Sequence, residues 1–155
     1  MNITLKHLFW IIVILGIITP FIGYAVVIEI FFLLIPFGII LMVSLLIFIF
    51  NILKYKNNIL KQKSTLVLFL LPIFLISQVV STFAVDKIQR FRGNQIIKKI
   101  QEKEITINSS PIKNFGIEYY KLKDTDFVIQ YDRGFLVTQK YYNKEKKWKS
   151  YGWNE

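Results

Sequence analysis

The sequence lacks cysteine, has a single histidine, His7, and carries almost no charge in its first third. The absence of cysteine excludes disulfide bonds, thiolate catalysis and cysteine-ligated metals. One histidine without a second histidine or a cysteine does not make a zinc site. We therefore expect no metal or other cofactor. The sequence also offers no nucleophile and base in a recognisable arrangement, which argues against an enzyme.

Charge is distributed very unevenly along the chain. Residues 8–53 carry one formal charge, that of Glu29, whereas residues 86–155 carry fifteen Lys or Arg and nine Asp or Glu. About 18 consecutive apolar residues already mark a bilayer span. We therefore interpret the chain as an integral, multi-pass membrane protein. Its abundance of Ile, Lys and Asn is typical of an AT-rich genome and favours a bacterial cell membrane.

The long apolar run fits two helices, because one span needs about 20 residues. Thr19-Pro20 and Gly23 weaken a helix at that point. The sequence thus predicts a first span at residues 5–23, a turn at 24–30 and a second span at 31–50.

A third apolar run, at residues 65–85, follows a short loop rich in Lys and Asn. Three transmembrane helices are therefore predicted, with a re-entrant first hairpin as the alternative. Residues 1–85 are assigned to a transmembrane domain and residues 86–155 to an extramembrane domain.

The extramembrane domain is predicted to be α+β. Apolar residues recur at helical spacing from Ile88 to Ile100 with Lys and Arg between them, which predicts an amphipathic helix that continues the third span or follows it closely. From Ile117 onward, short aromatic and β-branched runs separated by turn residues predict an antiparallel sheet of three or four strands. We expect so small a domain to lean on the membrane surface or on a partner.

A third span that runs on into a helix and an antiparallel sheet resembles, over residues 65–155, the head of a type IV pilin. The resemblance concerns the order of elements alone. Pilins carry this helix at their processed N-terminus, whereas two apolar runs precede it here. The resemblance therefore implies no function.

The orientation follows from the lysine and arginine residues near the span ends. Lys6 and four lysines of the loop at 51–64 oppose six basic residues at 86–103, which is close to a balance. The first span usually dominates, and long segments translocate largely regardless of charge. We predict a cytoplasmic N-terminus and an extracytoplasmic C-terminal domain.

Glu29 and a polar group in the third span form a candidate intramembrane site. A carboxylate in a span is costly and often marks an ion or proton path, but a turn at 24–30 would leave Glu29 solvated at the interface. The polar group consists of Ser77, Gln78, Ser81 and Thr82. Helix packing is its simpler interpretation, and the sharper hypothesis pairs Gln78 with Glu29 in a buried polar site.

A basic and aromatic surface is the second candidate site. It comprises Tyr142, Lys146, Lys147, Trp148 and Trp153. Interleaved rings and cations suit single-stranded nucleic acid, but they equally suit anionic lipid headgroups. A domain tethered to a bilayer favours the lipid interpretation over nucleic acid, and another membrane or envelope protein is the further candidate partner.

Three functions remain open on these features. The first is a non-enzymatic binding or accessory protein that presents its basic C-terminal domain at the membrane surface. The second is a transport or channel-like component that uses Glu29 and the Gln78 polar group. The third is a membrane immunity protein that protects its cell from a toxin.

Overall fold

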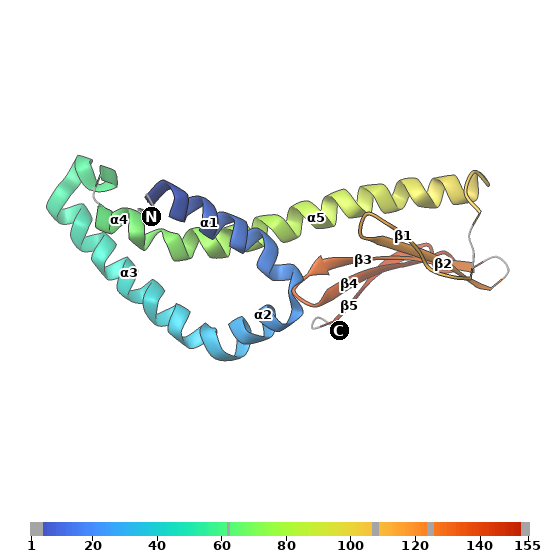
Figure 1. The fold of residues 1–155 in the computed structure, drawn as a ribbon, viewed down its shortest axis with the longest axis horizontal. Helices are drawn as coiled ribbons and strands as arrows, with labels where there is room; N and C mark the ends of the chain where they lie inside the picture. Colours follow the sequence, from blue (N-terminus) through green and yellow to red (C-terminus); the bar gives the residue numbers. More distant parts are fainter. Residues whose placement is uncertain (1–4, 62, 107–108, 124–125, 153–155) are drawn as a thin grey trace. The chain divides into compact units, whose positions relative to one another are not determined.

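The computed structural model describes residues 5–61, 63–106, 109–123 and 126–152 (Figure 1). The chain divides into a helical unit, Met1–Ser81, and a C-terminal unit, Thr82–Glu155. The helical unit contains α1 (Leu5–Ile18), η1 (Thr19–Phe21), α2 (Gly23–Ile28), η2 (Glu29–Leu33), α3 (Leu34–Tyr55), η3 (Lys56–Lys61), α4 (Lys63–Leu68) and the beginning of α5 (Leu70–Gln101).

The first helical hairpin turns earlier in the chain than the sequence predicted. The helical path breaks at Ile22, which is extended (φ −101°, ψ 99°), and residues 24–30 are helical instead of forming a turn. Pro20 has no backbone N–H to donate to the Gly16 carbonyl, and the Thr19 hydroxyl donates to the Leu15 carbonyl at 2.7 Å. These two residues end α1, so Glu29 lies inside a helix.

Glu29 begins η2, a π-helical segment that joins α2 to α3 without a break in the helix. Pro36 lacks an amide hydrogen and leaves the carbonyl of Phe32 without its usual helical donor. This missing donor accounts for the widened turn, and such π-helical insertions are frequent at functional sites.

Two helical stretches, Gly23–Tyr55 and Thr65–Gln101, are long and apolar enough to cross a membrane. The apolar helix Lys6–Phe21 is shorter. Within Thr65–Gln101, a turn at Phe69 separates α4 from α5. Pro72 lies in the first turn of α5 and has no amide hydrogen for the Leu68 carbonyl, so the helical ladder is interrupted at this point.

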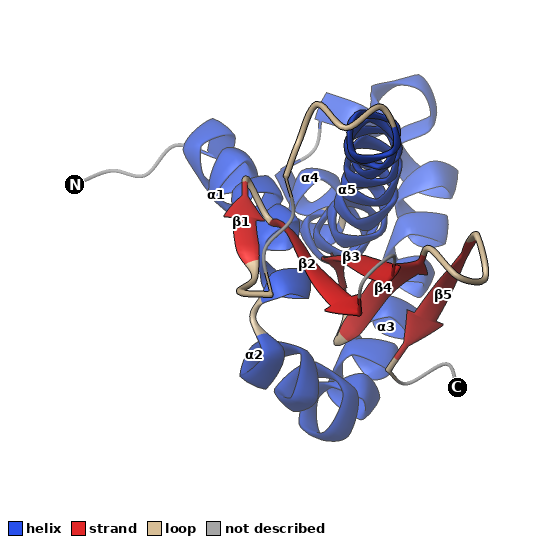
Figure 2. Cartoon of the chain, turned by 90° about the vertical axis from the view of Figure 1, so that its right-hand side faces the viewer, coloured by secondary structure: helices blue, strands red, loops and turns tan. Residues whose placement is uncertain are grey.

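The C-terminal unit consists of the later part of α5 and a five-stranded antiparallel sheet (Figure 2). Its strands, in the order of the sheet, are β1 (Ile112–Asn114), β2 (Ile117–Lys123), β3 (Asp126–Gly134), β4 (Val137–Tyr142) and β5 (Lys147–Tyr151). The prediction of three or four strands was wrong, because it missed the short strand β1. Three residues are too few to show a strand alternation in the sequence.

One face of the sheet packs against α5, and we call it the inner face. Its residues form two rows across the strands: Ile112, Tyr119, Ile129, Tyr141 and Trp148 in one, and Asn114, Ile117, Tyr131, Gln139 and Ser150 in the other. Ile96 and Ile97 of α5 complete the buried core with them. The predicted amphipathic helix is thus the second half of a single helix, α5.

Candidate functional site

The helical unit contains a polar pair between η2 and α5. The side-chain amide of Gln78 donates to both carboxylate oxygens of Glu29, at 2.9 Å and 3.0 Å. Gln78 is buried and Glu29 is half-buried. Leaving a buried polar group unpaired on an apolar helix surface is costly, so such a contact is favoured. The structure therefore brings together the two residues that the sequence-based hypothesis had paired.

The serines of the predicted polar group lie at the contact between α1 and α5. Ser81 donates to the Ile17 carbonyl at 2.9 Å, and Ser77 donates to the Phe74 carbonyl at 2.7 Å. A methyl group added at Gly16 would collide with the Ser77 side chain. Small residues let helix backbones approach closely, so these serines support helix packing. Thr82, the last member of the group, is buried and lies in the C-terminal unit.

A second polar contact closes the other end of the helical unit. The Asn51 amide donates to the Thr65 hydroxyl at 3.0 Å, and both residues are buried. From Asn51 back to Glu29 the helix rises about 33 Å, whereas Thr65 to Gln78 covers about 20 Å. The longer segment, from Glu29 to Asn51, must therefore bow outward between the two contacts, as α3 does in Figure 1.

The other face of the sheet, which we call the outer face, is polar and aromatic. A row of charged and amide side chains crosses all five strands: Lys113, Glu118, Gln130, Lys140 and Lys149. Glu118 binds Lys113 at 2.7 Å and accepts a hydrogen bond from Gln130 at 2.8 Å. The hydrogen bond with Lys113, followed by that with Gln130, lowers the pKa of Glu118.

A hollow of about 470 Å³ lies on the outer face along this row. Both signs of charge line it, through Lys113, Glu118, Asp132 and Lys140. Within the described part of the C-terminal unit, no helix covers this face. The outer face can therefore offer donors and acceptors side by side to a ligand.

Aromatic rings and lysines alternate beside the hollow in what we call the aromatic–lysine cluster: Lys140, Tyr142, Lys149 and Tyr151. The Tyr142 and Tyr151 rings lie 6.2 Å apart, and the Lys140 and Lys149 ammonium groups lie over them at 5.1 Å and 5.8 Å. The hydrogen bond with Tyr151 raises the pKa of Tyr142. Such cation–π contacts hold the rings and ammonium groups in a defined array.

The structure divides the predicted basic and aromatic surface between two faces. Tyr142 and Lys147 belong to the outer face, and Lys146 lies in the exposed turn before β5. Trp148 points to the inner face, where its ring reaches Gly93 and its indole nitrogen donates to Asn94 at 3.1 Å. Successive residues of a strand face opposite sides, which separates Trp148 from its neighbours. Trp153 lies outside the described residues.

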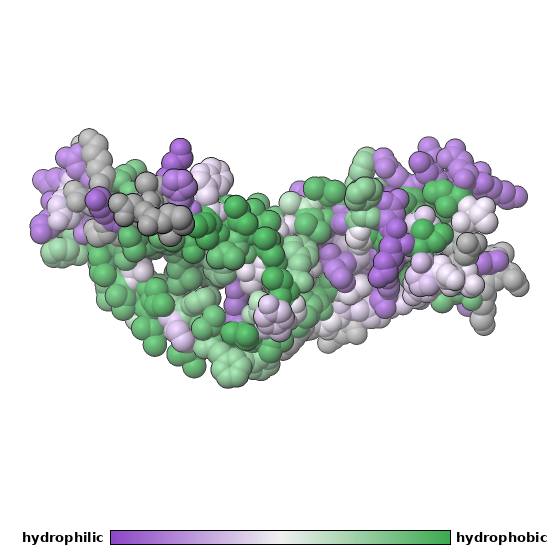
Figure 3. All heavy atoms as spheres, viewed as in Figure 1, coloured by the Kyte–Doolittle hydropathy of each residue, from purple (hydrophilic) through white to green (hydrophobic). Residues whose placement is uncertain are grey.

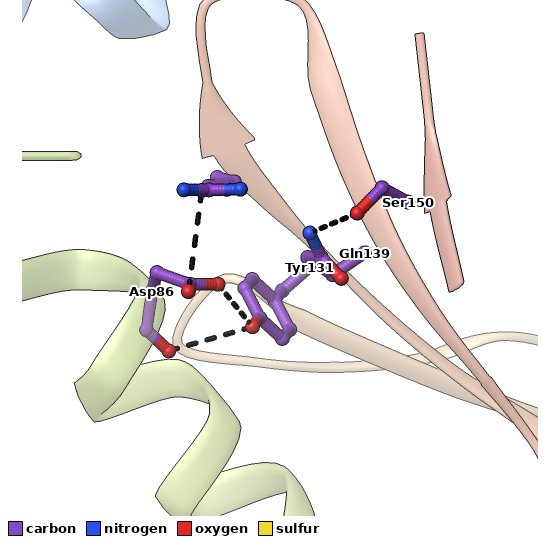
Figure 4. Close-up of polar contacts among 5 residues, drawn as sticks. Asp86, Tyr131, Gln139 and Ser150 are labelled. Atoms are coloured by element: carbon purple, nitrogen blue, oxygen red, sulfur yellow. Dashed lines mark hydrogen bonds and ion pairs between the residues drawn. The ribbon is translucent and has the colours of Figure 1, made fainter. Parts of the chain in front are cut away.

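Asp86 of α5 fixes the β3–β4 hairpin to the helix, and we call such a helix–sheet contact a latch (Figure 4). Its carboxylate accepts a hydrogen bond from the Tyr131 hydroxyl at 2.7 Å, and Arg133 approaches its other oxygen at 4.0 Å. Burial, followed by the hydrogen bond to Asp86, raises the pKa of Tyr131. Next to Tyr131 in the same row of the inner face, Gln139 donates to Ser150 at 2.7 Å.

A second latch holds the β1–β2 hairpin. Gln89 and Arg92 of α5 both donate to the Phe115 carbonyl at 3.0 Å, and the Arg92 guanidinium lies 5.5 Å from the Phe115 ring centre. Sequence reasoning missed both latches. Their partners are more than twenty residues apart and follow no spacing that a sequence pattern reveals.

In the described part of the chain, His, Asp and Glu form no group of three that would hold a metal ion. No family model, no curated protein and no solved structure matches the chain. The order of elements that resembles a pilin head therefore adds nothing to the functional argument, which depends on the geometry of the two units.

Proposed function

We propose that this chain is a small multi-pass membrane protein that binds another membrane or envelope protein through its C-terminal unit. The membrane assignment is supported by one observation above all. None of the most apolar window of Gly23–Tyr55 is buried within the protein, although its mean hydropathy is 3.0. A core helix of a soluble protein would be covered by its neighbours. A bare apolar helix of this length is long enough to cross the roughly 30 Å hydrocarbon core of a bilayer.

Figure 3 supports the same proposal, because apolar residues cover the visible face of the helical unit around α1, α2 and α3. Under this proposal α1 with η1 is the shortest of three spans, and a short span is accommodated by local thinning of the bilayer. The N-terminus lies in the cytoplasm of a bacterial cell and the C-terminal unit lies outside the membrane.

The binding role is supported by the outer face of the sheet. The buried core of the inner face packs against α5, whereas the outer face carries a hollow, a charged row and the aromatic–lysine cluster. Tyrosine is a residue type that protein interfaces favour. A non-enzymatic accessory protein needs such a surface and needs no catalytic group.

The membrane assignment and the binding role are tested in two steps. Membranes are first washed with alkaline carbonate, which releases peripheral proteins. The full chain is expected to stay in the pellet, and its release would contradict the membrane assignment.

To test the binding role, a photoreactive phenylalanine analogue is placed at Tyr142, with Lys98 on exposed α5 as the control position. A discrete protein adduct from position 142 and none from position 98 is expected. Equal labelling at both positions, or none, would contradict the outer face as the binding surface.

The Glu29–Gln78 pair supports a second candidate, an ion- or proton-conducting component. A carboxylate that an apolar segment holds by an amide is a group that transport proteins use. In proteoliposomes, Glu29→Gln is expected to abolish ion flux, whereas Glu145→Gln, a carboxylate of the exposed β4–β5 turn, leaves it unchanged. Absence of flux in the unmodified chain would rule this candidate out.

A further inference from the structure

The exposed apolar side chains of the C-terminal unit gather at one end of it. In its described part, six large apolar residues are exposed: Phe83, Ile88, Phe91, Phe115, Leu122 and Leu136. Five of the six lie either on the first turns of α5 in this unit or in the β1–β2 and β3–β4 turns. We call these five residues the apolar end. Leu122 lies near the opposite end of β2 and is not part of it.

The sheet register places both turns at the same end. The β1–β2 turn leads directly into Ile117, which pairs with Tyr131, and three residues later β3 ends at Gly134 and enters the β3–β4 turn. The latches at Asp86 and at Arg92 hold these hairpins beside the first turns of α5. Those two helix residues are only about 9 Å apart along the axis. Both turns and the residues of the apolar end on α5 therefore lie at the same end of the unit.

The two turns have an unusual composition. Phe115 (φ 46°), Phe135 (φ 52°) and Leu136 (φ 59°) adopt positive φ, in tight hairpin turns where Asn and Gly are the preferred residues. Bulky side chains are costly in this conformation. Phe115 nevertheless exposes 85% of its surface. An apolar residue that gains little burial from the chain itself, at a position that disfavours it, indicates contact with something outside the chain.

Cations lie among the apolar residues of α5 at this end. They are Lys87, Arg90 and Arg92. The last apolar run of α5, which includes Phe83, ends immediately before Asp86. Apolar side chains beside lysine and arginine are the composition of surfaces that enter the headgroup layer of anionic bilayers.

We propose that the apolar end inserts into the headgroup layer of the anionic bilayer that α5 crosses. This inference rests on the proposed membrane assignment. Insertion of both turns beside α5 holds the C-terminal unit in one orientation. The sheet then stands on the membrane by its turns, and its outer face is held in a fixed position for a partner.

The chain has no cysteine, so single cysteines carry an environment-sensitive nitrobenzoxadiazole label at chosen positions. Phe115→Cys and Leu136→Cys probe the apolar end, and Leu122→Cys is the matched exposed position at the other end of the sheet. Ile39→Cys on α3 reports on the bilayer itself. Each labelled full chain is reconstituted into vesicles of phosphatidylglycerol and phosphatidylcholine, with a quencher attached to the lipid headgroup.

We expect blue-shifted emission and several-fold stronger headgroup quenching at positions 115 and 136 than at position 122. Equal, water-like signals at 115, 136 and 122 would overturn the inference, as would a shift at 115 and 136 that appears only at high protein density and so reports a second copy. A protected, apolar signal at position 39 in the same vesicles keeps that failure distinct from a failure of the membrane assignment. A variant that does not fold is recognised by its loss of the native near-ultraviolet circular dichroism.

Discussion

The side-chain amide of Gln78 and the carboxylate of Glu29 are joined by two hydrogen bonds, at 2.9 Å and 3.0 Å, across 49 positions of the chain. This contact ties η2, near the start of the apolar stretch Gly23–Tyr55, to α5. Together with the Asn51–Thr65 contact at the other end, it determines the bow of α3. These polar contacts therefore fix the positions of the helices along one another, which apolar surfaces alone would not do.

Replacing Gln78 by Leu should destabilise the helical unit. The change leaves the Glu29 carboxylate without its amide partner, and hydrogen bonds between membrane helices contribute about 0.6 kcal/mol and up to about 1.7 kcal/mol. Thermal unfolding in detergent micelles, followed by circular dichroism, measures the loss. Val79→Leu, the exposed neighbour on α5, is the control and should change nothing. Equal midpoints for both variants would show that the pair does not stabilise the helices.

Replacing two glycines of the apolar helices by alanine should change the stability of the helical unit in different directions. Gly16→Ala places a methyl group against Ser77, so α1 must move away from α5. At Gly38 no atom lies within 4 Å of an added methyl, and alanine favours a helix over glycine by about 1 kcal/mol. We expect a lower unfolding midpoint for Gly16→Ala and an equal or higher one for Gly38→Ala. A loss of the same size at both sites would contradict the close α1–α5 contact.

Much of this fold follows from patterns that the sequence displays locally. The apolar runs reveal the long helices, and the alternation along β3 and β4 reveals the sheet. The turn at 24–30 was predicted wrongly because Glu29, a lone charge, was assumed to need water. Its partner Gln78 lies on a helix distant in sequence, and that partner allows Glu29 to remain inside a helix.

The candidate sites were harder to predict from the sequence, because they too depend on contacts between residues that are distant in the chain. Membership of the outer face depends on strand register, which a one-residue shift inverts. Trp148 therefore seemed equivalent to Lys147 until the pairing of β4 with β5 placed them on opposite faces. The latches at Asp86 and Arg92 depend on tertiary contacts between helix and sheet, which a periodic sequence pattern does not predict.

Removing the Tyr131 hydroxyl should loosen the sheet from α5. Tyr131→Phe deletes the hydrogen bond to Asp86, and a hydrogen bond to a charged group contributes about 1.5 to 3 kcal/mol. Denaturant unfolding of the C-terminal unit, followed through Trp148 fluorescence in a background in which Trp10 and Trp153 are replaced by Phe, measures this loss. In a double-mutant cycle, Asp86→Asn should cost much less in the Tyr131→Phe background than in the unmodified chain. Strictly additive effects would show that the two groups do not act together.

Alkaline pH should weaken the same contact in a direction that the pKa of Tyr131 determines. Burial and the hydrogen bond to Asp86 raise this pKa from its usual value of 10.0. Because the folded state binds the phenolic proton more tightly than the unfolded state, the stabilisation is complete below about pH 10 and falls as the pH rises further. The unfolding free energy of the unmodified chain should therefore decline above about pH 10, whereas that of Tyr131→Phe should decline less. Tyr24→Phe, an exposed tyrosine of the helical unit, is the control. A parallel alkaline decline in all three proteins would mean that Tyr131 ionises as freely in the folded state as in the unfolded one.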